Sequence, residues 1–145
     1  MRMFLAVLLL VVTTAGRAAE GNPMVIESGR DLYVKCTALR EIMTGSPAIE
    51  GDRVVLSAAC LNYIDGFRNG HVFTSAHTAQ RNKKGAITGS DVRKAQFFCA
   101  SANVTNTELV DAALSYLNKR PEKRDSPAGL VLMIALREAF PCPRQ

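Results

Sequence analysis

The chain has 145 residues, with 18 basic and 13 acidic side chains and a formal net charge of +5 at neutral pH. This length suits one domain with its own core and is short for two. The excess of positive charge is mild and no nucleic-acid-binding motif accompanies it, so the composition argues against nucleic acid as a partner.

The first 18 residues have the pattern of a signal peptide. Arg2 precedes an apolar run over residues 4–12, which is too short to span a bilayer. Gly16 and Ala18 are small residues at the two positions that precede a cleavage site, so we expect cleavage after Ala18. The mature protein is then a single periplasmic domain of residues 19–145 without membrane association. A buried N-terminal helix or a retained membrane anchor is the alternative.

Two amphipathic helices are expected in the first half of the mature chain. Ser28 and Asp31 form a capping pair for the first helix, which Gly45 ends. Its apolar stripe consists of Leu32, Cys36, Leu39 and Met43. Asp52 is a candidate cap for the second helix, which we expect to run to about Ala76.

The segment between residues 80 and 89 is predicted to be an exposed loop. It is polar, contains two glycines and three basic residues, and shows no apolar periodicity. Such a loop is either a solvated connector or a binding segment that enters the cleft of a partner. Under the second interpretation, the candidate partner-binding residues are Arg81, Asn82, Lys83 and Lys84.

The remaining pattern predicts further helices and no strand. A short helical piece is expected over residues 90–99, and Thr105 with Glu108 caps a helix that Pro121 closes.

The last helix has a start signal in Ser126 followed by Pro127, and Pro141 ends it. No alternating pattern is long enough for a strand. We therefore predict an all-α fold, a small disulfide-bridged bundle of about four to five helices.

The four cysteines are Cys36, Cys60, Cys99 and Cys142. An even number in a small exported chain is typical of disulfides, although four cysteines allow three pairings. If neighbouring helices form antiparallel hairpins, the first two cysteines are level across one hairpin and the last two across another. We therefore predict these two pairs. The cysteine spacing does not fit a zinc site.

The sequence contains no recognisable catalytic set. The two histidines, His71 and His77, are six residues apart and point to different sides of a helix. Asp65 and Asp111 could form a carboxylate pair but are more typical of solvated helix positions. We expect no enzyme activity, no catalytic residue, no metal and no cofactor. Gly66 and Gly70 predict close helix packing inside the domain.

A group of short motifs resembles the Rap/Tai family of immunity proteins. Cys60, Tyr63, Ile64 and Gly66 form a Cys-x-x-Tyr-Ile-x-Gly signature, and the chain has Phe98-Cys99 and a final Phe140-Pro141-Cys142. With Cys36, the resemblance extends from about Leu32 to Cys142. It implies a small helical periplasmic protein that binds a peptidoglycan amidase effector protein of type VI secretion and occludes the cleft holding its catalytic groups.

Two other functions stay open at this point. A periplasmic chaperone or stress-binding protein similar to HdeA would also be small, helical and disulfide-bridged, but such proteins are shorter and carry one bridge. A secreted hydrolase such as a phospholipase would need a histidine–aspartate or metal constellation that is not evident. Self-association into a homodimer is likewise undecided.

Overall fold

The computed structural model describes residues 22–45, 51–101 and 103–143. The expected signal peptide and its cleavage site lie outside the described residues. The helices are α1 (Gly29–Met43), α2 (Gly51–Asn82), α3 (Gly89–Lys94), α4 (Asn106–Lys119), the 3-10 helix η1 (Pro121–Asp125) and α5 (Ala128–Ala139). The part of the chain described contains no strand and two disulfides, so the predicted all-α, disulfide-bridged fold is confirmed.

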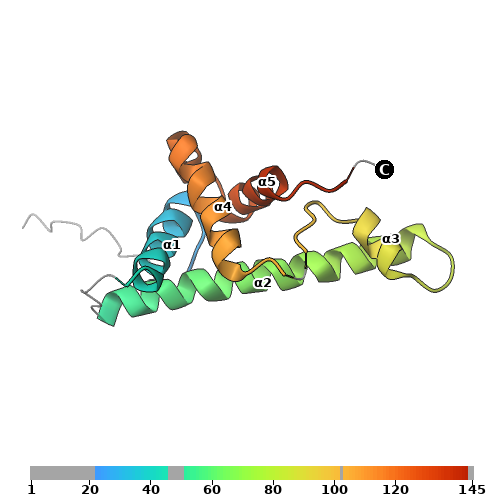
Figure 1. Cartoon of the computed structure of the whole chain (residues 1–145), viewed down its shortest axis with the longest axis horizontal. Helices are drawn as coiled ribbons and strands as arrows, with labels where there is room; N and C mark the ends of the chain where they lie inside the picture. Colours follow the sequence, from blue (N-terminus) through green and yellow to red (C-terminus); the bar gives the residue numbers. More distant parts are fainter. Residues whose placement is uncertain (1–21, 46–50, 102, 144–145) are drawn as a thin grey trace, which may run out of the picture.

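The long helix α2 organises the molecule (Figure 1). Helices α1, α4 and α5 lie on one side of its first part, and α3 packs against its other end. We call residues 71–98, which comprise the end of α2, α3 and the adjoining turns, the arm. The other described residues form the body.

The body contains nearly all of the hydrophobic core. Its largest fully buried side chains come from four helices: Leu32, Ile64, Leu109, Leu117, Leu132 and Leu136. The capping boxes predicted at Ser28–Asp31 and at Thr105–Glu108 are both present. Because these boxes satisfy N–H groups at the helix starts, they fix where α1 and α4 begin.

Helix α2 is longer than the sequence pattern predicted. It runs to Asn82 rather than to about Ala76, because no glycine or proline interrupts residues 71–82 and because Ser75 and Ala79 are buried in the part of α2 that contacts α3. Residues 80–82 are therefore helical. Asp52 lies within the first turn of α2 and does not cap it, although a carboxylate there is favourable beside the helix dipole.

Helix α3 begins and ends earlier than expected. Thr88 is its cap and Asp91 completes the capping box, so Gly89 is already helical. The helix ends at Lys94 instead of near Cys99. The chain must leave the helix there, because Phe98 is buried in the core and Cys99 is bonded to a cysteine beyond α5.

Helix α5 does not use the predicted Ser126 cap. The Ser126 carbonyl accepts from Gly29 N at 2.8 Å, and Ala128 N donates to the Glu27 carbonyl at 2.8 Å. Ser126 is thus part of a short antiparallel contact that joins the starts of α1 and α5. Helix α5 begins at Ala128 without a side-chain cap.

The predicted disulfide pairs are confirmed. Cys36 and Cys60 join α1 to α2, and both are fully buried. Cys99 and Cys142 join the segment after α3 to the segment after α5, and both are partly exposed. Among the described helices, none is both long and apolar enough to cross a membrane.

Candidate partner-binding site

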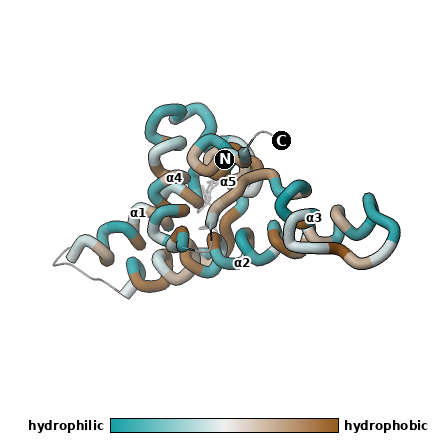
Figure 2. The backbone as a smooth tube through the Cα atoms, turned by 45° about the vertical axis from the view of Figure 1, so that its right-hand side comes forward, coloured by the Kyte–Doolittle hydropathy of each residue, from teal (hydrophilic) through white to brown (hydrophobic). Residues whose placement is uncertain are grey.

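The four residues predicted to contact a partner lie at the tip of the arm. Arg81 and Asn82 end α2, Lys83 and Lys84 follow directly, and all four side chains are exposed. In Figure 1 this tip is the right-hand extremity of the molecule, and in Figure 2 it is largely coloured as hydrophilic. The position makes these side chains accessible to a large partner.

The tip is a closed turn rather than a long polar loop. The Lys83 ammonium pairs with Asp91 at 2.7 Å, and the Gln80 amide donates to the Gly85 carbonyl at 3.3 Å. Gly85 has φ +104°, a left-handed conformation that glycine adopts without strain. Only residues 83–88 separate α2 from α3, so the tip is held at both sides.

Asp91 is the residue that fixes this turn. Hydrogen bonds from Lys83, and then from the Thr88 hydroxyl and backbone N–H, hold the pKa of the Asp91 carboxyl well below its ordinary value of 3.8. The carboxylate is therefore ionised at neutral pH and compensates the charge of Lys83. Within the described residues, Arg81 and Lys84 form no ion pair.

Helix α3 adds two basic residues that the sequence analysis missed. Arg93 and Lys94 are exposed and return to the same end of the molecule, because the turn at residues 83–88 folds α3 back onto α2. The arm contains five basic residues and one acidic residue, a net charge of +4. The rest of residues 19–145 contains eleven basic and twelve acidic residues, a net charge of −1. The Thr88–Asp91 capping signal could have revealed this hairpin.

A small pocket lies between the end of α2 and α3. Its volume is about 250 Å³. The lining residues are Ala79, Asn82, Lys83, Asp91, Lys94 and Ala95. Two lysines and one aspartate thus surround a concave site at the most basic place in the protein. Of the charged side chains in its lining, only Lys94 lacks an ion pair within the described structure.

The root of the arm is fixed by aromatic packing. The rings of His71 and Phe98 stack with their centroids 4.0 Å apart, and His71 Nε2 lies 3.2 Å from the Phe98 carbonyl oxygen. Burial lowers the pKa of His71, although this hydrogen bond opposes the shift. His77 is exposed on another side of α2. The two histidines therefore do not form a joint site.

Gly66 and Gly70 do not pack inside the domain, contrary to the expectation from their spacing. A Cβ atom added at either position would meet no atom within 4 Å. Both glycines lie on the face of α2 that carries Phe73, whose side chain is 75% exposed. The body covers the opposite face, where Ile64 is fully buried. The spacing alone could not distinguish these faces.

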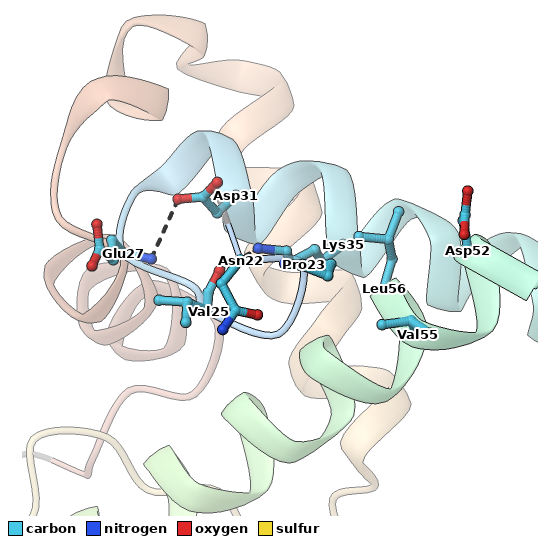
Figure 3. A pocket seen from close by; sticks show the side chains of 9 residues that line it. All are labelled: Asn22, Pro23, Val25, Glu27, Asp31, Lys35, Asp52, Val55 and Leu56. Carbon is cyan, nitrogen blue, oxygen red and sulfur yellow. Dashed lines mark hydrogen bonds between the residues drawn. The ribbon is translucent and has the colours of Figure 1, made fainter. Parts of the chain in front are cut away.

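A second, larger pocket lies beside the start of α1 and α2 (Figure 3). Its volume is about 880 Å³, and its lining consists of Asn22, Pro23, Val25, Glu27, Asp31, Lys35, Asp52, Val55 and Leu56.

Two polar side chains of this larger pocket, those of Lys35 and Asp31, form hydrogen bonds that stabilise the fold. Lys35 is buried and donates to the Val25 carbonyl. Burial alone would raise the pKa of Asp31, but hydrogen bonds from Ser28 and Glu27, with the charge of Lys35, lower it overall. Asp31 is thereby committed to capping α1. Among the described residues that line this pocket, none is a serine, cysteine or histidine, the usual nucleophiles and bases.

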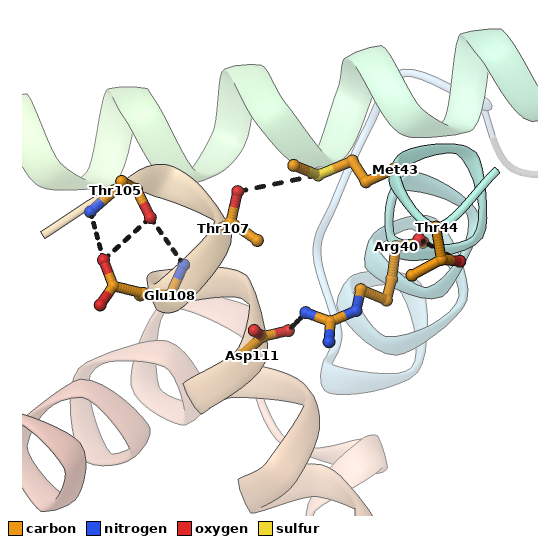
Figure 4. A network of polar contacts seen from close by, with 7 residues as sticks. All are labelled: Arg40, Met43, Thr44, Thr105, Thr107, Glu108 and Asp111. Atoms are coloured by element: carbon orange, nitrogen blue, oxygen red, sulfur yellow. Dashed lines mark hydrogen bonds and ion pairs between the residues drawn. The ribbon is translucent and has the colours of Figure 1, made fainter.

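Asp65 and Asp111 are not brought together as a carboxylate pair. Asp111 forms an ion pair with Arg40, which links α4 to α1 (Figure 4). Asp65 instead accepts from the Asn106 amide at 3.1 Å. A contact of 3.8 Å from the Thr107 hydroxyl to the Met43 sulfur lies beside the Arg40 pair. These groups therefore hold helices together.

Metal and thiol chemistry have no evident place in this part of the chain. Within residues 22–45, 51–101 and 103–143, no three histidine, cysteine or carboxylate side chains are grouped as metal ligands. All four cysteines are in disulfides. The distinctive features of the described surface are thus the basic arm and the exposed face of α2.

The fold is a small disulfide-bridged helical bundle with a protruding basic arm, and its two disulfides suit an oxidising environment. The family model of Rap1a immunity proteins matches residues 28–142, which include helices α1 to α5 and all four cysteines. The chain therefore belongs to the family of Rap1a immunity proteins. No significant match to a curated protein or to a solved structure was found.

Proposed function

We propose that this immunity protein acts in the periplasm, where it binds a peptidoglycan amidase delivered by type VI secretion and occludes its active-site cleft. Membership in the family of Rap1a immunity proteins is the observation that carries the proposal. The amidase as target and the periplasm as location follow from the resemblance and from the signal-peptide pattern of residues 1–18. Two disulfides suit that compartment.

The proposed mode of action is binding without chemistry. The arm protrudes beyond the body, and its tip is narrow because a single turn over residues 83–88 joins α2 to α3. A narrow convex tip fits a concave site, and substrate clefts are concave. Arg81, Asn82, Lys83 and Lys84 are the proposed contacts, with Lys83 acting through the turn that its ion pair with Asp91 holds.

The test uses the mature chain and the amidase encoded beside its gene. We expect the two purified proteins to form a complex and the amidase to lose its peptidoglycan-cleaving activity in proportion to the complex formed. Cells that direct the amidase to their periplasm should lyse without this protein and survive with it. A version of the protein without residues 1–18, which remains in the cytoplasm, should not protect.

The outcome also distinguishes the immunity proposal from a periplasmic chaperone or stress-binding protein. If the amidase and the protein form no complex at micromolar concentration and cells survive the amidase unprotected, the immunity proposal for this target is wrong. Suppression of the aggregation of unrelated unfolded proteins would then favour the chaperone.

A further inference from the structure

We propose that the pocket between the end of α2 and α3 is a carboxylate-binding site, which receives an aspartate or glutamate side chain from an acidic surface of the protein partner. This inference deepens the proposed function by assigning the chemistry of the contact. It rests on the distribution of charge, the shape of the site and the state of each group in its lining.

The distribution of charge is the first observation. A net charge of +4 is concentrated in 28 residues of the arm, whereas the remaining mature chain has a net charge of −1. Such segregation makes the arm the positive pole of the molecule. An acidic surface is attracted to that pole from a distance, so the arm reaches its partner before the body does.

The pocket supplies a place where one carboxylate can be held. Asn82 lies on its α2 side and Lys94 on its α3 side. A lysine ammonium and an asparagine amide are both donors, so they can bind the oxygens of one carboxylate. The apolar walls at Ala79 and Ala95 reduce competition from water.

The other two charged groups in the lining leave Lys94 available. Asp91 is already engaged by Lys83 and by the capping bonds of Thr88. Those contacts compensate the negative charge of Asp91, so it opposes an incoming carboxylate only weakly. Lys94 is exposed, is the last residue of α3 and lines the pocket.

The experiment compares two charge reversals at equivalent helix positions. Lys94 and Lys119 are the final residues of α3 and α4, and both are exposed. Lys94→Glu should weaken the complex with the amidase by about tenfold, with a slower association rate and a loss of salt dependence. Lys119→Glu changes the net charge equally and should leave affinity within about twofold. Circular dichroism verifies that both variants fold.

A partner-independent measurement keeps this inference separate from the proposed function. A short oligoglutamate peptide is titrated into the isotope-labelled mature protein, and the backbone amide signals are followed by NMR. We expect shifts at Asn82, Lys83, Lys94 and Ala95, abolished by Lys94→Glu and absent with oligolysine. If the amidase fails to bind but these shifts appear, the proposed target is wrong and the site stands.

Three results would overturn the site. Oligoglutamate shifts spread over the lysines of the body, such as Lys119 and Lys123, would mean that only net charge is sensed. Equal weakening of the amidase complex by Lys94→Glu and Lys119→Glu would likewise show that binding depends only on net charge. Stronger binding of the arm to phosphatidylglycerol vesicles than to oligoglutamate at physiological salt, abolished by Lys94→Glu, would identify a membrane surface as the partner.

Discussion

The body and the arm of this protein share helix α2, but the two regions differ in how much of that helix is buried by other elements. In the body, α2 packs against α1 and α4, is joined to α1 by a buried disulfide and borders a leucine-rich core. In the arm, the same helix is accompanied by only six residues of α3, and the largest side chain buried there is Phe98 at the root. The difference indicates that the body supplies stability, whereas the arm presents charge on a rigid support.

The largest effect is expected where the body is cross-linked. Replacing Cys60 by Ala should lower the free energy of unfolding by about 2–5 kcal/mol, because it opens a bridge between the two central helices. Urea unfolding of the purified mature chain measures this loss. Phe73→Ala is the control in the arm and should change stability by less than about 0.5 kcal/mol, since the side chain is exposed. A larger loss of unfolding free energy in Phe73→Ala than in the Cys60 variant would contradict the view that the body supplies the stability.

Two glycine-to-alanine changes should have opposite signs. Gly29→Ala places a Cβ atom 2.6 Å from the Lys123 carbonyl oxygen, so the backbone must move and about 1–3 kcal/mol should be lost. Gly70→Ala meets open space inside an exposed helix and should gain about 0.5–1 kcal/mol. Thermal unfolding of both variants gives the signs directly. Destabilisation by Gly70→Ala would show that this face of α2 is covered.

The same Gly70→Ala variant sharpens the picture of the exposed face. If the amidase binds only through the tip of the arm, this substitution should leave affinity unchanged within about twofold, because Gly70 lies about three helical turns before the predicted contacts at Arg81 and Asn82. Isothermal calorimetry measures the affinity. A loss of more than tenfold would extend the contact surface along α2.

The smallest expected effect is the pH dependence of the stability of the arm. The pKa of Asp91 is lowered in the folded protein, so its contribution to the arm is complete above the unfolded value near 3.8 and decreases as pH falls toward the lower folded value. NMR titration of the Asp91 carboxyl carbon should give a midpoint below 3.8. At neutral pH, Asp91→Ala should lower amide protection at residues 88–94 only, with the global unfolding midpoint unchanged. A titration midpoint of Asp91 at its ordinary value near 3.8 would show that the ion pair with Lys83 does not form in solution.

Much of the body could be predicted from the sequence, because its signals are local or periodic. The Ser28 and Thr105 capping boxes fixed two helix starts, and the spacing of the cysteines across two hairpins predicted both bridges. Ser126 was misassigned because its carbonyl is taken by Gly29, a contact between segments almost a hundred residues apart. The capping preferences of neighbouring residues give no information about contacts between distant segments.

The arm was harder to predict because polar sequence does not exclude helix. Gln80, Arg81 and Asn82 have no apolar period, yet burial of Ala79 under α3 extends α2 through them. Arg93 and Lys94 were missed for the same reason: their proximity to Lys83 depends on a hairpin that only tertiary packing creates. The candidate contacts at residues 81–84 could therefore be predicted from the sequence. The pocket beside them became visible only in the folded structure.

The most direct test of the central claim is hydrogen–deuterium exchange of the mature protein, alone and with the amidase. We expect the amidase to slow exchange in residues 77–95, at the tip of the arm, and to leave exchange in α1, α4 and α5 unchanged. Protection centred on the larger pocket at residues 22–35 and 52–56, with none in the arm, would contradict the assignment of binding to the arm.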